Sequence, residues 1–201
     1  MLETQWRVEA YAALSQLLKK PDPELLAFIN EPGFQEVWQQ VSGAYGVAFP
    51  QSWKSSSLPD LAEWKKSWNL TMGPLNAMAE PIESLYKVWT TDPSCENPIA
   101  TQKGYLKGDW GWHMETLLKK SGIAIPVEFA HCPDHLILEL EFFSMLAEQS
   151  TAAAQQVFAK HHLDWLEDLF HTAKDRKIPQ LYQDLYEFAY LFVKADINSL
   201  S

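Results

Sequence analysis

The chain has 201 residues, of which 47% are hydrophobic and 21% are charged, a composition typical of folded globular proteins and too hydrophobic for a disordered one. It carries 16 Lys and Arg residues against 26 Asp and Glu residues, so its formal net charge is −10 at pH 7. Such an acidic surface repels phosphates, which argues against nucleic acid as a partner. Most of the excess negative charge lies in residues 121–201, a region that would attract a cationic partner.

The number of cysteines and the hydropathy of the chain indicate a cytoplasmic protein. Its two cysteines, Cys95 and Cys132, are too few for a disulfide framework or a thiolate metal site. Residues 1–7 lack the basic start and apolar core of a signal peptide. No stretch approaches the roughly 18 apolar residues of a membrane span. We therefore expect a cytoplasmic protein with no stable membrane insertion.

Apolar residues recur at spacings of three and four through the first 70 residues, which predicts amphipathic helices. The first helix runs over about 6–17 and ends near Pro21. Asp22 is a good N-cap for the next helix, with Pro23 at its first position. Two further helices are predicted around 34–41 and 61–68, with a loop over 46–60 between them.

The second half of the chain is also helical. Residues 71–111 hold four prolines and four glycines, which predicts short helices with long connections. A helix is expected over 112–120, and an extended connector over 127–132, between two prolines. Three strong helices follow, over 134–149, 151–173 and 179–195. The last is apolar almost all round, which implies a buried central helix. Since no alternating strand pattern occurs, the fold class is all-α.

The connector suggests a division of the chain. We predict a compact multi-helix bundle with an N-terminal helical lobe (1–126), a connector or hinge (127–133) and a C-terminal helical lobe (134–201), the alternative being one compact domain. A hinge at that position would allow either a monomer or a dimer that swaps its lobes.

The densest polar cluster contains Asp134, His135 and Glu139, followed by His162. Such carboxylate and imidazole sets can hold a metal or perform acid–base chemistry. This order matches no standard motif, and glycine-rich phosphate loops and the GxSxG nucleophile pattern are absent. The structural interpretation makes Asp134 a helix N-cap and His162 a hydrogen-bonded core residue. The functional alternative is a metal-dependent helical hydrolase that uses all four residues.

Nine tryptophans are the second unusual feature, and eight of them precede residue 113. Tryptophan usually packs in a core, and composition alone favours that interpretation here. At Trp68 and Trp89, beside proline-rich connections, the alternative is an exposed aromatic groove, because rigid flat side chains bind peptides well.

Several motifs in order resemble one protein family. They are Gly73-Pro74, the segment Glu80-Pro81-Ile82-Glu83-Ser84-Leu85-Tyr86, Gly108-Asp109, the run Asp134-His135-Leu136 with Glu139-Leu140, and His162-Leu163 with Trp165. Together they span about residues 68–170. The sequence resembles the TorD/DmsD-like redox-enzyme maturation chaperones, which are related to the nitrate reductase delta-subunit assembly chaperones.

The resemblance implies a TorD-like helical protein that is not an enzyme and needs no cofactor or metal of its own. It implies a cytoplasmic chaperone that binds the twin-arginine signal peptide, the body, or both, of the catalytic subunit of a molybdopterin oxidoreductase. Cofactor insertion would be assisted and export delayed until it is complete. An alternative is a structural subunit that stays in the redox complex. The residues that we expect at the peptide groove are Trp68, Pro81, Glu83, Ser84, Tyr86, Pro133, Asp134, His135 and Glu139.

Overall fold

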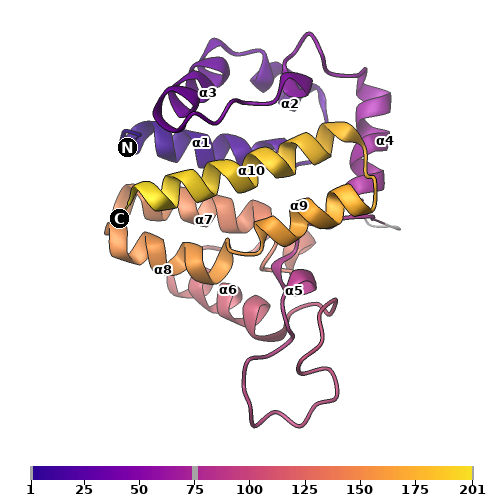
Figure 1. Ribbon diagram of the computed structural model, residues 1–201, viewed down its shortest axis with the longest axis vertical. Coiled ribbons are helices and arrows are strands. Elements are labelled where there is room, and N and C mark those ends of the chain that lie inside the picture. The colour runs from indigo at the N-terminus through magenta and orange to yellow at the C-terminus, as the bar shows by residue number, and fades with distance from the viewer. Residues whose placement is uncertain (1, 74–76, 201) are drawn as a thin grey trace.

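The structure is a computed structural model that describes residues 2–73 and 77–200, so Pro74 of the Gly73-Pro74 motif lies outside the described residues. Within them the prediction of an all-α fold is confirmed, and the only extended pairing is an isolated antiparallel bridge between Ile82 and His135. Among the helices of this part of the chain, none is long and apolar enough to cross a membrane. In chain order (Figure 1), the elements are α1 (Thr4–Leu17), α2 (Pro23–Ile29), α3 (Pro32–Tyr45), η1 (Gln51–Trp53), α4 (Leu61–Met72), α5 (Glu83–Tyr86), α6 (Gly108–Lys120), η2 (Val127–Phe129), α7 (Leu136–Gln149), α8 (Ala152–His162), α9 (Leu166–Asp175) and α10 (Gln180–Ser199).

Local sequence signals set the helix ends in the N-terminal half. The Asp22 side chain accepts a hydrogen bond from the Leu25 amide at 2.7 Å, as expected of an N-cap. Helix α3 ends at Gly46, whose φ of 69° is in the left-handed region that glycine adopts without strain. The predicted loop and the predicted connector each contain a single 3-10 turn, η1 and η2.

The predicted helix over 151–173 is wrong in one respect, because the chain breaks into α8 and α9 between residues 162 and 166. The Trp165 indole donates to the His162 carbonyl at 2.8 Å, and that carbonyl would otherwise accept the amide four residues later. A side-chain hydrogen bond thus replaces a helical one, and the chain turns there.

A single continuous core joins the elements on both sides of the predicted connector. Helix α1 packs along α7, and α10 contacts α3, α4, α8 and α9, so α10 is central as predicted. Figure 1 shows α10 crossing the molecule in front of α1 and α7, with α5, α6 and the long loop between them at one end. Buried residues from 1–126 and 134–201 belong to the same cluster. The division into two lobes and the hinge at 127–133 stay predictions.

One buried ion pair connects the two ends of the chain. The Arg7 guanidinium of α1 binds both carboxylate oxygens of Asp196 on α10, at 2.7 and 2.8 Å. The same carboxylate accepts hydrogen bonds from the hydroxyls of Tyr11 and Tyr45, at 2.9 and 2.6 Å. Because Arg7 and Asp196 are almost completely buried, either charge left alone would be strongly destabilising.

We therefore expect Asp196→Ala to lower the free energy of unfolding by about 3–5 kcal/mol, because it leaves a buried guanidinium without its carboxylate. Urea denaturation followed by circular dichroism measures this change. Glu187→Gln, at an exposed position of the same helix, should change it by less than about 0.5 kcal/mol. A loss below about 1 kcal/mol for Asp196→Ala would show that the ion pair is not a major link between α1 and α10.

Candidate functional site

The predicted polar residues meet where residues 81–84 run beside residues 134–136. The Leu136 amide donates to the Pro81 carbonyl at 2.8 Å, and the Glu83 amide donates to the Asp134 carbonyl at 3.0 Å. The Asp134 carboxylate accepts the Ser84 amide at 2.8 Å. The prediction that Asp134 is the N-cap of the helix that follows it is wrong, because the N-cap of α7 is His135. The Asp134 carboxylate instead binds an amide in the first turn of α5, 50 residues earlier in the chain, and fixes the turn between the two segments.

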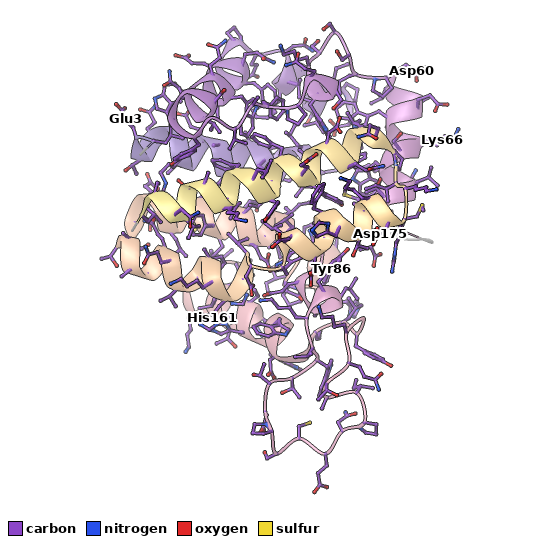
Figure 2. All side chains as sticks on the ribbon, viewed as in Figure 1. Glu3, Asp60, Lys66, Tyr86, His161 and Asp175 are labelled. Atoms are coloured by element: carbon purple, nitrogen blue, oxygen red, sulfur yellow. The ribbon has the colours of Figure 1, made fainter. Side chains whose placement is uncertain are left out.

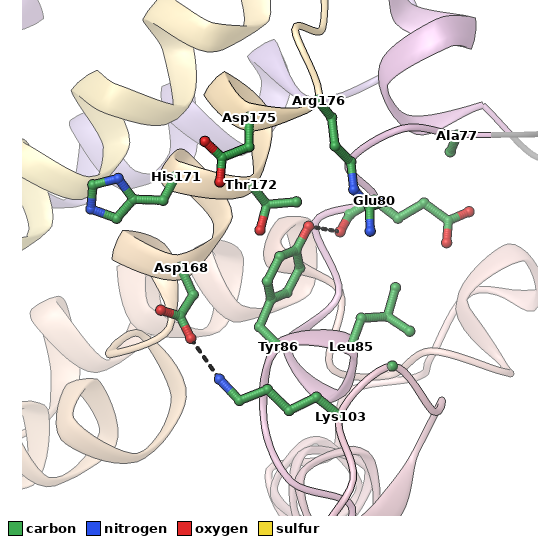
Figure 3. Close-up of a pocket in the computed structure, with 11 residues that line it drawn as sticks. Ala77, Glu80, Leu85, Tyr86, Lys103, Asp168, His171, Thr172, Asp175 and Arg176 are labelled. Carbon is green, nitrogen blue, oxygen red and sulfur yellow. Dashed lines mark hydrogen bonds and ion pairs between the residues drawn. The ribbon is translucent and has the colours of Figure 1, made fainter.

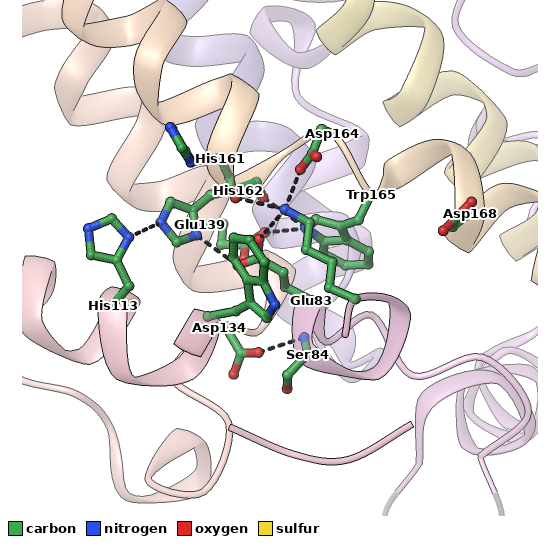
Figure 4. A network of polar contacts seen from close by, with 12 residues as sticks. Glu83, Ser84, His113, Asp134, Glu139, His161, His162, Asp164, Trp165 and Asp168 are labelled. Carbon is green, nitrogen blue, oxygen red and sulfur yellow. Dashed lines mark hydrogen bonds and ion pairs between the residues drawn. The ribbon is translucent and has the colours of Figure 1, made fainter. Parts of the chain in front are cut away.

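Behind this crossing lies a group of polar side chains, which we call the buried cluster (Figure 4). Four of its members are buried, Lys87 is mostly buried and His113 is exposed; the buried four are Glu83, Asp134, Glu139 and His162. His162 on α8 is completely buried and lies 2.7 Å from a Glu83 oxygen through Nδ1. Its Nε2 lies 2.7 Å from Nδ1 of His113 on α6, a residue on the exposed side of that helix. This chain of contacts links α5, α6 and α8.

Lys87 supplies the positive charge of the buried cluster. Its ammonium lies 2.8 Å from Glu83, forms an ion pair with Asp164 and donates to the His161 carbonyl at 2.8 Å. It also lies over the Trp110 ring, 4.0 Å from the ring centroid. The side chain is 11% exposed, so these contacts stabilise a charge that is largely removed from water.

The protonation of the carboxyl groups follows from their partners. Burial, together with the neighbouring charge of Glu83, raises the pKa of Glu139 well above its usual range. Burial also favours the protonated form of Glu83, but the hydrogen bond with His162 and the charge of Lys87 lower its pKa. The environment of Glu139 therefore favours its protonated form, and its Oε2 accepts a hydrogen bond from the Trp165 indole at 3.2 Å. Burial likewise raises the pKa of Asp134.

The four residues considered for a hydrolase do not form one set. Among the described residues, atoms close enough for a shared metal belong to Glu83, Glu139 and His162, within 4.8 Å of one another. His135 lies outside this group, because its Nδ1 accepts the Ile137 amide at 3.2 Å and its ring packs 4.9 Å from that of Phe129. Asp134 is engaged with α5. This grouping gives no support to the four-residue hydrolase site.

Two cavities lie near the crossing of residues 81–84 and 134–136. The first, of about 400 Å³, lies between α4, α7 and the connector and is lined by Trp68, Phe129, His135, Ile137 and Leu138, with Lys19 and Glu141 at its polar side. The Trp68 indole donates to the Leu18 carbonyl at 2.9 Å, which fixes the ring at the cavity wall. We call this the aromatic cavity.

The second cavity, of about 500 Å³, lies between α5, α9 and the loop that precedes α6 (Figure 3). Glu80 and Arg176 lie on one side, Asp168 and Asp175 lie on α9, and Tyr86 lies between them. Lys103 pairs with Asp168 at 2.9 Å, so the lining has three carboxylates and two cationic side chains. Figure 2 shows Tyr86 and Asp175 at the edge of the bundle, above the long loop. We call this the acidic cavity.

The structure divides the predicted groove residues into two groups. Trp68 and His135 line the aromatic cavity, and Tyr86 lines the acidic cavity. The others are buried between the cavities: Pro81, Glu83, Ser84, Pro133, Asp134 and Glu139. Asp134 has no exposed surface, so in this structure it fixes the turn and does not line an opening. The part of these residues in peptide binding stays a prediction.

Two members of the buried cluster were not predicted from the sequence. Lys87 lies four residues after Glu83, a spacing typical of an ion pair on one helical face, and that signal was available. His113 had no such signal, because only the packing of α6 against α8 brings it to His162. Trp89 is half-buried beside the loop, and its amide and carbonyl make backbone hydrogen bonds with Gln102 and Asp109.

The pH dependence of stability tests the environment of His135. Burial lowers the pKa of His135 to about 3, so the folded chain keeps this ring neutral where the unfolded chain, with a pKa near 6.5, binds a proton. The residue therefore stabilises the fold above pH 6.5, and this contribution is lost as the pH falls. Between pH 7.5 and 5 we expect it to account for up to about 2 kcal/mol of the loss in unfolding free energy.

His135→Asn keeps a neutral acceptor for the Ile137 amide and should remove that part of the pH dependence. Chemical denaturation of both proteins at several pH values measures the difference in slope. Parallel slopes between pH 5 and 7 would mean that His135 titrates normally in the folded chain.

A protein-family model described as "Nitrate reductase delta subunit" matches residues 12–181, which include the buried cluster and both cavities. No curated protein matches the chain significantly. Since the match covers most of the sequence, the chain belongs to the nitrate reductase delta subunit family, a family of assembly chaperones for molybdenum enzymes.

Proposed function

We propose that the protein is a cytoplasmic chaperone that binds the twin-arginine signal peptide of a molybdopterin oxidoreductase, with or without the body of that enzyme. It assists cofactor insertion and delays export until the enzyme is mature. The observation that carries the proposal is the pair of cavities near the crossing of residues 81–84 and 134–136, one acidic and one aromatic. A twin-arginine leader has the matching composition, because two guanidinium groups precede an apolar segment.

The acidic cavity suits the arginines. Among the described residues, no ion pair engages the carboxylates of Glu80 or Asp175, which therefore stay available to an incoming cation. Guanidinium groups bind carboxylates in a bidentate way, with more directional hydrogen bonds than an ammonium can make. The Tyr86 ring between the carboxylates, stacked on Trp165 with centroids 5.1 Å apart, offers a rigid wall.

The aromatic cavity suits the apolar part of the leader. Trp68 and Phe129 provide rigid rings, and Ile137 and Leu138 provide aliphatic surface. An amphipathic helical peptide places its apolar side chains in such a groove. His135, at the bridge with Ile82, lies on the same wall and joins this cavity to the residues that border the acidic one.

Binding, and not chemical conversion of the peptide, accounts for this arrangement. The acid and imidazole groups that could perform catalysis are buried between the cavities and engaged with one another. The side chains that face the cavities are those that recognise charge and apolar surface.

Isothermal titration calorimetry with a synthetic twin-arginine leader of an oxidoreductase encoded beside this protein tests the proposal. We expect the wild-type chain to bind it. The double variant Glu80→Gln/Asp175→Asn should weaken binding about 3- to 10-fold, because each exposed charge pair contributes about 0.2–1 kcal/mol. Trp68→Ala should weaken it about 10-fold or more, as expected for an aromatic anchor.

Matched control variants distinguish residues that contact the peptide from residues that only maintain the fold. Asp134→Asn keeps an acceptor for the Ser84 amide and should leave the affinity unchanged, while Asp134→Ala should destabilise α5 by about 1 kcal/mol. A leader with both arginines replaced by alanine should bind more weakly, and the acidic-cavity double variant should not weaken it further. The proposal fails if the wild-type chain binds no leader, or if the arginines contribute nothing to the affinity.

A further inference from the structure

Three carboxylates and two cationic side chains line the acidic cavity, and one of the cations already engages a carboxylate. The Lys103 ammonium donates a hydrogen bond to Oδ2 of Asp168 at 2.9 Å (Figure 3). Arg176, the second cation, instead donates to the Met78 carbonyl at 2.8 Å. Among the described residues the other two carboxylates form no ion pair, so Asp168 is the one whose charge is paired before a ligand binds.

The backbone around Lys103 holds this residue beside the cavity. The Trp89 amide donates to the Gln102 carbonyl at 2.9 Å, and the Gly104 amide donates to the Leu85 carbonyl at 3.1 Å. Gly104 has a φ of 93°, a conformation that residues with a side chain rarely adopt. Because the neighbours of Lys103 on both sides are bonded to the segment that begins with α5, the fold places the Lys103 side chain next to α9.

Asp168 lies on the face of α9 that lines the cavity. Residues 171, 172 and 175 lie three, four and seven positions after it and line the same cavity, so they share one side of the helix. The carboxylates of Asp168 and Asp175 therefore border one space (Figure 3). Successive side chains of an extended peptide point in opposite directions, which lets two adjacent arginines reach two separate carboxylates.

We propose that Asp168 is a third arginine-binding carboxylate, masked in the free protein by Lys103, and that an arginine of the leader peptide displaces this lysine. The inference rests on the proposed binding of a twin-arginine leader. The ammonium hydrogen-bonds to one oxygen of Asp168, whereas a guanidinium binds both oxygens in parallel. The two side chains of the existing pair are 56% and 54% exposed, so the pair opens at little cost. Lys103 is thus an internal competitor of the ligand.

Binding of the first arginine favours displacement of Lys103 by the second. Once one guanidinium is bound at Glu80 or Asp175, the next arginine belongs to a molecule that is already bound. Its effective concentration near Asp168 is then about millimolar, as for other short flexible connections. An isolated cation lacks this advantage and competes poorly with a lysine that is itself tethered. Lys103 therefore protects Asp168 from isolated cations more than from paired arginines.

Calorimetric titration with the twin-arginine leader measures the competition. Lys103→Gln should bind the leader about 2- to 5-fold more tightly than the wild-type chain, because the arginine no longer has to break an exposed ion pair. In an Asp168→Asn background the same substitution should give little of this gain, because the masked carboxylate is gone. Lys174→Gln removes one positive charge from α9 outside the cavity lining and should change the affinity less, since solvent and salt screen that charge.

Chemical cross-linking follows the displacement without relying on affinity. A water-soluble carbodiimide joins an amine to a carboxylate in contact as an amide, and the reagent takes up the lost water to become a urea. We expect a cross-link between Lys103 and Asp168 in the free chain, detected by mass spectrometry after proteolysis, and its loss at saturating N-acetylated leader. The exposed pair of Lys119 and Glu115 on α6 should cross-link equally with and without the leader.

The inference is overturned if Lys103→Gln binds the leader no more tightly than the wild-type chain, if Asp168→Asn leaves that gain intact, or if saturating leader does not reduce the cross-link. These results leave the proposed function standing, because the wild-type chain still binds the leader in each case. A wild-type chain that binds no leader contradicts the proposed function itself, and this inference with it.

Discussion

The structure depends on the neutralisation of carboxylates that are buried between helices. Glu83 can be ionised inside the protein because His162 and Lys87 reach it from two sides, and Glu139 is tolerated because it carries a proton. These groups come from α5, α7 and α8, so no one helix can move away without leaving a buried polar group alone. The buried cluster therefore holds the short helix α5 in place far more firmly than four residues of helix could by themselves.

This explains why the family motifs identify the fold better than the binding surface. Asp134, Glu83 and His162 each lie in a segment that the sequence resemblance singled out, and the structure places all three in the joint between segments. Of the residues that line the cavities, Trp68 and Asp175 belong to no such motif, whereas Tyr86 and His135 do. Residues that are buried and hydrogen-bonded to one another are restricted by the packing of the two segments. Exposed residues that recognise a partner are free to differ when the partner differs.

The helices were predictable because their signals are local. Apolar periodicity and the Asp22 cap are properties of consecutive residues, and α1 and α2 follow from them. The break between α8 and α9 was not predictable in that way, because the pattern of apolar residues continues through it. There the Trp165 indole donates a hydrogen bond to the His162 carbonyl. The same indole contacts the Glu139 carboxyl group of α7, which is distant in the sequence. The contact between His113 and His162 could not be predicted from the sequence either, because it also depends on tertiary packing.

The two cavities and the buried cluster are mechanically connected through residues 77–82. Glu80 borders the acidic cavity, Ile82 pairs with His135 at the aromatic one, and Glu83 begins α5 directly afterwards. The contacts of Glu83 with Lys87 and His162 restrict the motion of these residues before a peptide arrives. Binding that must order a segment costs conformational entropy, and a segment already ordered costs less. By thermodynamic linkage, a peptide that needs this ordered arrangement would in turn stabilise the contacts of the buried cluster.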